Sequence, residues 1–162
     1  MKGSDMKEFE VIIRKIPLFI QGEWIRKNSG YEAGLCDCLG WKQVLTRYFD
    51  AVTHGFKIEI KKGKSIWLDL VRYSEIVTGD GDLDTITAFF IPNDKKTEIE
   101  HIYFVKTDSI IRFLGLDKEH AEQIIKLKDL VPRQLNCQTS MTVSDVKKLA
   151  FYTHDTKGIL FE

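Results

Sequence analysis

Cysteine is scarce in this 162-residue chain, which holds three cysteines, at positions 36, 38 and 137. An odd number argues against a disulfide framework and for a reducing compartment, so we expect a cytoplasmic protein. The Cys36-x-Cys38 spacing is not that of a usual zinc pair, and the four histidines are scattered along the chain. We therefore expect buried or half-buried thiols rather than a zinc site.

Long hydrophobic runs are missing as well. No stretch approaches the ~18 apolar residues of a transmembrane helix, and the opening Met-Lys-Gly-Ser-Asp lacks the character of a signal peptide. We therefore expect no membrane partner. A phosphate loop, a dinucleotide fingerprint and a nucleophile triad are also absent. Their absence predicts no nucleotide cofactor and makes an enzyme of small-molecule metabolism the least favoured class.

The chain has no excess of charge of either sign, because 24 basic residues balance 24 acidic ones and the formal net charge is +0. A protein that binds DNA by non-specific electrostatic attraction would usually be more basic. Basic residues nevertheless gather locally, at Lys57, Lys61, Lys62 and Lys64. This cluster indicates either a local surface for an anionic partner or simply a solvated strand end.

The hydrophobic pattern predicts a single domain, 1–162, of mixed α/β class (α+β), with a mixed sheet flanked by helices. Period-3.6 segments predict helices over 5–28, 31–48, 65–77 (with its first residues open to an extended form), 109–114, 117–130 and 146–152. Two β-rich runs, 85–91 and 98–105, predict a pair of neighbouring strands. The polar stretches 78–82 and 131–141 are expected to be loops, the first without the terminal glutamate of an EF-hand.

A β-hairpin is predicted at the centre of the chain, where Phe49–Thr53 and Phe56–Lys62 flank His54-Gly55. Glycine supplies the positive φ that tight hairpin turns need, and histidine tolerates that region better than most residues. With a two-residue turn at 54–55, the sequence positions of any two residues that face each other add up to 109. Asp50 is then expected to face Glu59.

The period of two along this hairpin separates an apolar face from a charged one. It places Ile58 and Ile60 toward the core, and Glu59 and Lys61 on the opposite face with Asp50. Facing residues have Cβ atoms ~5 Å apart, so two carboxylates there repel each other. Lys61 offsets part of that repulsion, and a hard cation such as Mg²⁺ would offset the rest.

The pattern Asp50-x8-Glu59-x-Lys61 resembles the active site of the PD-(D/E)xK nuclease superfamily, and most of all that of its short homodimeric type II restriction endonucleases. Phe49 stands where the family usually has proline. The resemblance implies a restriction-endonuclease-like core over about 30–106, with N-terminal helices and a C-terminal helical and loop region. It also implies Asp50, Glu59 and Lys61 as catalytic residues, with Mg²⁺ held by Asp50, Glu59 and the Ile60 carbonyl.

The same resemblance implies a function and further site residues. A homodimer would hydrolyse phosphodiester bonds of double-stranded DNA at a short, palindromic sequence, because protein two-fold symmetry then matches the symmetry of the site. Glu32, on the helix before the site, is a candidate extra metal ligand, although a glutamate there also complements a helix N-terminus. Candidate DNA-contacting residues, of types that bind phosphates or base edges, are Lys62, Lys64, Arg133, Gln134, Asn136 and Gln138.

Two other interpretations remain open from the sequence. A junction-resolving or repair nuclease of the same superfamily would use the same residues on branched or damaged DNA. Alternatively, Asp50, Glu59 and Lys61 form a surface ion-pair cluster on a non-enzymatic domain that binds DNA or protein, and such clusters are common.

Overall fold

A six-stranded mixed sheet organises the fold, and helices cover it, as the sequence predicted for the class. The computed structural model describes residues 31–79, 81–95, 99–130 and 137–155, so the helix predicted over 5–28 lies outside the described residues. The strands follow the order β1-β2-β3-β5-β6-β8, and only the β3–β5 pair is parallel. Their bounds are β1 Lys42–Gln43, β2 Ala51–Thr53, β3 Phe56–Lys62, β5 Thr85–Pro92, β6 Ile99–Lys106 and β8 Tyr152–Asp155.

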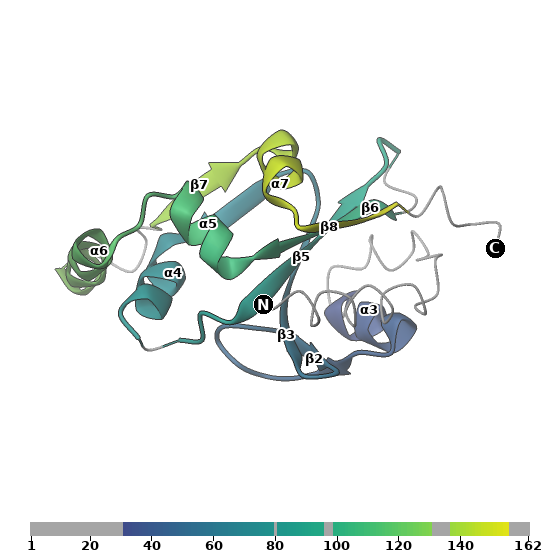
Figure 1. Cartoon of the computed structure of the whole chain (residues 1–162), viewed down its shortest axis with the longest axis horizontal. Helices are drawn as coiled ribbons and strands as arrows, with labels where there is room; N and C mark the ends of the chain where they lie inside the picture. The colour runs from purple at the N-terminus through teal and green to yellow at the C-terminus, as the bar shows by residue number, and fades with distance from the viewer. Residues whose placement is uncertain (1–30, 80, 96–98, 131–136, 156–162) are drawn as a thin grey trace.

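A separate two-stranded ribbon and the helices complete the described structure (Figure 1). The ribbon pairs β4 (Ile66–Asp69) with β7 (Gln138–Met141) in antiparallel fashion. The helices are α3 Tyr31–Leu39, α4 Leu70–Val77, α5 Thr107–Phe113, α6 Lys118–Leu130 and α7 Val143–Leu149. Among the described residues, no helix is both long enough and apolar enough to cross a lipid bilayer.

The sheet carries one buried apolar cluster on each face. Alternate residues of β5 and β6 enter different clusters, because successive side chains of a strand point to opposite faces. Phe90 and Phe104 pack with α3, whereas Phe89 and Val105 pack with α4, α5, α6 and α7. Figure 1 shows α3 on one side of the sheet and α4 and α5 on the other. Strand β5 is therefore buried along its whole length, which explains its largely apolar sequence.

The central hairpin has the predicted turn and most of the predicted register. Ala51 pairs with Ile58, and His54 and Gly55 both have positive φ, 46° and 85°. The register does not continue to an Asp50–Glu59 pair, because the Asp50 N–H donates to the Ile58 carbonyl at 2.8 Å. The partner strand therefore begins at Ala51 rather than at Phe49, and that part of the prediction was wrong.

The helix predicted over 31–48 is shorter than its apolar pattern suggests. It ends at Leu39, and Gly40 takes a φ of 72°, which glycine adopts without steric cost. The Trp41 N–H then donates to the Cys36 carbonyl at 2.9 Å, a helix-terminating contact of the kind found around a C-terminal glycine. Beyond it, Lys42–Gln43 forms the edge strand β1. Local glycine chemistry thus outweighed the hydrophobic period.

The C-terminal part also differs from the sequence prediction. Gln138–Met141 is strand β7 rather than loop, since it finds β4 as a partner far away in sequence. The residues 65–77 divide into strand β4 and helix α4, as the extended alternative for their first residues allowed. The last helix begins at Val143, earlier than predicted, and residues 152–155 form strand β8 on the sheet edge beside β6.

The N-terminus of α7 carries a capping box that offers a direct test of local stability. The Thr142 hydroxyl accepts the Asp145 N–H at 3.0 Å, and the Asp145 carboxylate accepts the Thr142 N–H at 3.1 Å. Thr142→Ala is expected to lower the free energy of unfolding by ~1 kcal/mol, as is usual for a lost N-cap. Urea denaturation measures it. The control is Ser144→Ala, two residues further on at an exposed position, which should change stability by less than ~0.5 kcal/mol. Equal effects of the two substitutions would contradict the capping role.

Candidate active site around strand β3

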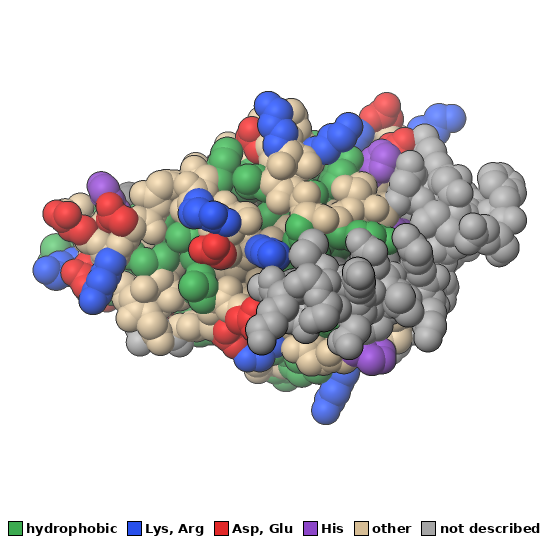
Figure 2. Space-filling view, viewed as in Figure 1, with side chains coloured by type: hydrophobic (Ala, Val, Ile, Leu, Met, Phe, Trp, Pro, Cys, Tyr) green, Lys and Arg blue, Asp and Glu red, His purple; other side chains and the backbone are tan. Residues whose placement is uncertain are grey.

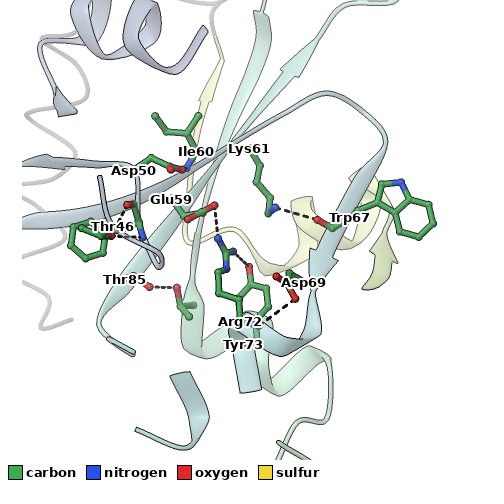
Figure 3. A network of polar contacts seen from close by, with 12 residues as sticks. Thr46, Asp50, Glu59, Ile60, Lys61, Trp67, Asp69, Arg72, Tyr73 and Thr85 are labelled. Carbon is green, nitrogen blue, oxygen red and sulfur yellow. Dashed lines mark hydrogen bonds and ion pairs between the residues drawn. The ribbon is translucent and has the colours of Figure 1, made fainter. Parts of the chain in front are cut away.

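Strand β3 presents Glu59 and Lys61 toward the side on which α4 packs, while Ile58 and Ile60 belong to the opposite core cluster beneath α3. Figure 3 shows the two charged side chains reaching from β3 toward α4 and β4. Glu59 is only 8% exposed and stands beside Thr87 of β5 in the parallel register. The predicted separation of an apolar and a charged face is therefore confirmed, with Glu59 buried and Lys61 and Asp50 half-buried.

Asp50 lies in the bend just before β2, the strand that pairs with β3 in the hairpin. Its carboxylate oxygen Oδ2 accepts the Ile60 N–H at 2.8 Å, so a side chain takes the place of a backbone partner where the ladder is broken. The bend is fixed by Thr46, whose hydroxyl donates to the Phe49 carbonyl at 2.8 Å and accepts the Phe49 N–H at 3.1 Å. Asp50 is thus held beside the centre of β3 without directly facing Glu59.

Glu59 is paired with Arg72, a residue of α4 that the sequence analysis did not single out. Arg72 Nη1 lies 2.6 Å from Glu59 Oε1, and Arg72 Nη2 donates to the Tyr73 hydroxyl at 3.2 Å. Burial raises the pKa of Glu59, an effect that the charge of Arg72 opposes and that of Asp50 reinforces. Because the charge of Asp50 contributes to the raised pKa of Glu59, Asp50 lies within electrostatic reach of Glu59.

Lys61 extends along the same face and donates from Nζ to the Trp67 carbonyl at 3.1 Å. Burial lowers the pKa of Lys61, and the charge of Arg72 lowers it further, whereas the carboxylates of Glu59, Asp50 and Asp69 oppose the shift. Lys61 therefore lies within electrostatic reach of both predicted carboxylates. A cation close to these two carboxylates is the arrangement that the sequence motif predicted.

Glu32 joins this cluster from the first turn of α3. Burial raises the pKa of Glu32, the charge of Asp50 raises it further, and Lys61 opposes the shift. Glu32 is therefore close enough to Asp50 and Lys61 to feel their charges. Its position also suits the positive end of the α3 dipole, so both roles considered from the sequence are compatible with its placement.

The oxygen atoms gathered here are of the type that Mg²⁺ prefers, since Asp50, Glu59 and Glu32 supply carboxylates and Ile60 supplies a backbone carbonyl. The donor set therefore fits the predicted ion in its chemistry. In the described part of the chain, however, no three His, Cys, Asp or Glu side chains converge closely enough to hold a metal ion. The contacts show why: Glu59 is drawn to Arg72 and Asp50 to the Ile60 N–H.

The predicted DNA-contacting residues are spread over several elements. Lys62 is half-buried at the end of β3, and Lys64 follows it, with Nζ 2.5 Å from Asp94 Oδ1. Gln138 is exposed on β7 opposite Asp69, next to the half-exposed Trp67 of β4. Arg133, Gln134 and Asn136 lie outside the described residues. On the face in Figure 2, basic and acidic side chains of the described residues are interspersed rather than separated by sign.

Sequence reasoning missed Arg72 and Asp69, for different reasons. Asp69 is the N-cap of α4, because its Oδ1 accepts the N–H groups of Val71 (3.0 Å) and Arg72 (3.3 Å). An aspartate before an apolar helical run is a recognisable capping signal, so the start of α4 could have been found. The Arg72–Glu59 pair has no such signal, since only the crossing from β3 to α4 brings these residues together.

Comparison with known proteins does not assign this chain to a family. A scan of the chain against protein-family models gives no match, and a search of the curated proteins gives none either.

Proposed function

We propose that this protein is a Mg²⁺-dependent endodeoxyribonuclease of the PD-(D/E)xK type, and that it acts as a type II restriction endonuclease on double-stranded DNA. The observation that carries the proposal is the electrostatic cluster of Asp50, Glu59 and Lys61 around β3. The charges of Asp50 and Lys61 both act on Glu59, although Asp50 comes from the bend before β2 and the other two residues from β3. Chance placement of an acidic-x-Lys tripeptide on a surface would not bury it beside a second carboxylate.

The order of elements supports the same proposal. Helix α3 precedes the antiparallel β2–β3 hairpin, α4 follows it, and β5 then returns parallel to β3. This succession of helix, hairpin, helix and strand is compatible with a restriction-endonuclease-like core. The Asp50 bend and the β3 charges lie at the centre of the arrangement, next to the first turn of α4 (Figure 3).

The proposed function assigns a different catalytic role to each residue of the cluster, according to its charge and position. Asp50, Glu59 and the Ile60 carbonyl form the oxygen set that would hold Mg²⁺, with Glu32 as the candidate extra ligand. The ion, when bound, polarises the scissile phosphate and lowers the pKa of a bound water. Lys61, a cation beside both carboxylates, would orient the attacking water and stabilise the negative charge that develops on the phosphorus oxygens. Its depressed pKa eases transfer of a proton from its ammonium group.

A DNA-reading role is proposed for the surface near the β4–β7 ribbon. Gln138 and Trp67 are exposed there, and Lys61 touches the same ribbon through the Trp67 carbonyl. Glutamine pairs with the edge of adenine, and the lysines 62 and 64 are suited to phosphates. Recognition of a palindrome would require a homodimer, with one active site for each strand. The free thiols of Cys36 and Cys137 support a reducing, cytoplasmic setting.

The first experiment is incubation of the purified protein with long bacteriophage DNA, in Mg²⁺ and in EDTA. Discrete fragments that form only with Mg²⁺ are expected, because a sequence-specific enzyme cuts at defined sites. A smear would instead indicate a nonspecific or repair nuclease. DNA that stays intact, while a four-way junction is cut, would indicate a junction-resolving enzyme.

A second candidate function keeps the ion-pair interpretation, and the buried Glu59–Arg72 pair favours it. In that case the cluster stabilises a non-enzymatic binding domain, and neither linear nor branched DNA is cut in Mg²⁺. Replacement of Glu59 would then change only stability.

A further inference from the structure

Helix α4 brings a permanent cation directly onto the carboxylate that the proposed function assigns to metal binding. We propose that Arg72 is the resident counter-ion of Glu59 and competes with Mg²⁺ for it, so that the metal binds only when the guanidinium leaves. Arg72 is then a positioning residue that keeps Glu59 in place and charged before the metal arrives. The inference rests on the proposed function, because it assumes that Glu59 is a ligand of Mg²⁺.

The contact geometry shows a close and enclosed ion pair. Arg72 Nη1 lies 2.6 Å from Glu59 Oε1, and the two side chains are 12% and 11% exposed. A carboxylate removed from water at this level requires a compensating charge, since an unpaired buried charge is costly. A divalent cation on the same carboxylate would lie beside the guanidinium in this enclosed setting, where two positive charges repel each other strongly. Binding of Mg²⁺ through Glu59 therefore works against this contact.

Arg72 is not fully satisfied where it lies, which favours an exchange. Its Nη2 donates to the Tyr73 hydroxyl, but its Nε is buried without a hydrogen-bond partner in the structure. Buried donors without acceptors are uncommon and costly. A divalent cation on Glu59 would add a second positive charge beside the guanidinium, and the repulsion would drive the guanidinium away from the carboxylate.

The exchange needs no movement of α4 itself. Asp69 caps the helix by accepting the N–H groups of Val71 and Arg72, so the backbone of Arg72 is anchored. Tyr73, the next residue, is 1% exposed in the core. The change that we infer is thus a rotation of the Arg72 side chain about a fixed backbone. Figure 3 shows the side chain in its paired position beside Glu59.

Calorimetric titration with Mg²⁺ alone, at pH 8 and without DNA, tests the competition. Arg72→Gln is expected to bind Mg²⁺ at least ~10-fold more tightly than the wild type, because a charge-assisted hydrogen bond no longer has to be broken. The matched control is Arg47→Gln, since Arg47 forms an ion pair of the same length, 2.6 Å, with Glu75 of α4 outside the cluster. It should bind like the wild type. Equal or weaker binding by Arg72→Gln overturns the proposal.

A second measurement uses the wild-type protein and does not depend on the folding of a variant. The Nε–Hε signals of the arginines are followed by NMR as Mg²⁺ is added. The Arg72 signal is expected to shift along the binding curve while that of Arg47 stays in place. An Arg72 signal that is unchanged at saturation overturns the proposal.

The failure of this inference can be told apart from the failure of the proposed function. If wild type and Arg72→Gln bind Mg²⁺ equally and the wild type cuts DNA, only the competition is wrong. If neither protein binds Mg²⁺ and no DNA is cut, both the competition and the metal-dependent function are wrong.

Discussion

Replacing Lys61 by alanine is expected to lower Mg²⁺-dependent cleavage of duplex DNA by ~100-fold or more, the size of effect seen when a charge-stabilising group is removed from an active site. The reason is that Lys61 is the cation that lies beside both Glu59 and Asp50 on the charged face of β3. The measurement is the initial rate of cleavage of a single-site plasmid. Binding of the uncut duplex, followed by gel shift in EDTA, should change by less than ~10-fold, because one lysine supplies only part of the phosphate contact.

The control for this substitution is Lys147→Ala, which removes an exposed lysine of α7 away from the cluster. It should cut DNA at the wild-type rate. Circular dichroism should show the same secondary structure for both variants, since Lys61 makes one hydrogen bond and no core contact among those described. Cleavage by Lys61→Ala at the wild-type rate would contradict the catalytic assignment and favour the ion-pair interpretation.

Phe90→Ala is expected to cause the largest loss of stability, ~3–5 kcal/mol, as is typical when a buried phenylalanine is truncated to alanine. Phe90 is 0% exposed on β5, in the cluster between the sheet and α3, and its ring meets that of Trp41 edge-on at 6.2 Å. The surrounding side chains cannot fill the space that the ring would leave. Urea denaturation, followed by tryptophan fluorescence, measures the change in the free energy of unfolding.

The matched control lies on the surface of the same half of the molecule. Leu45 is 97% exposed, so Leu45→Ala should change the free energy of unfolding by less than ~0.5 kcal/mol. A loss below ~1 kcal/mol for Phe90→Ala would contradict the central place of β5 in the core. If Phe90→Ala is less stable but still cleaves DNA at temperatures at which it remains folded, core packing and catalysis depend on different residues.

Residues close together in sequence determined much of this fold. The His54-Gly55 turn set the Ala51–Ile58 register, and the apolar runs predicted β5 and β6 as neighbouring strands. Alternation along β3 predicted which side chains share a face, because the period of two is a property of the strand itself. These features depend on backbone sterics and on hydrophobic patterning within a few residues. They could therefore be inferred without knowing any partner.

Tertiary contacts decided the features that the sequence could not show. Gln138–Met141 looked like a polar loop, yet it is a strand because β4 offers free hydrogen-bonding groups 70 residues earlier. Residues 152–155 became β8 for the same reason, since the edge of β6 accepts them. Strand pairing between distant segments leaves no local mark in short polar sequences, so periodicity alone misses it.

The candidate site shows the same division. From the sequence alone, Asp50, Glu59 and Lys61 could be assigned to one surface by turn geometry and alternation. The tertiary structure decided that Glu59 is buried, that Glu32 lies within electrostatic reach of the cluster, and that Arg72 forms an ion pair with Glu59. The physical reason is that burial and ion pairing depend on which helix crosses the strand, and the crossing of α4 over β3 is set by the packing of the whole core.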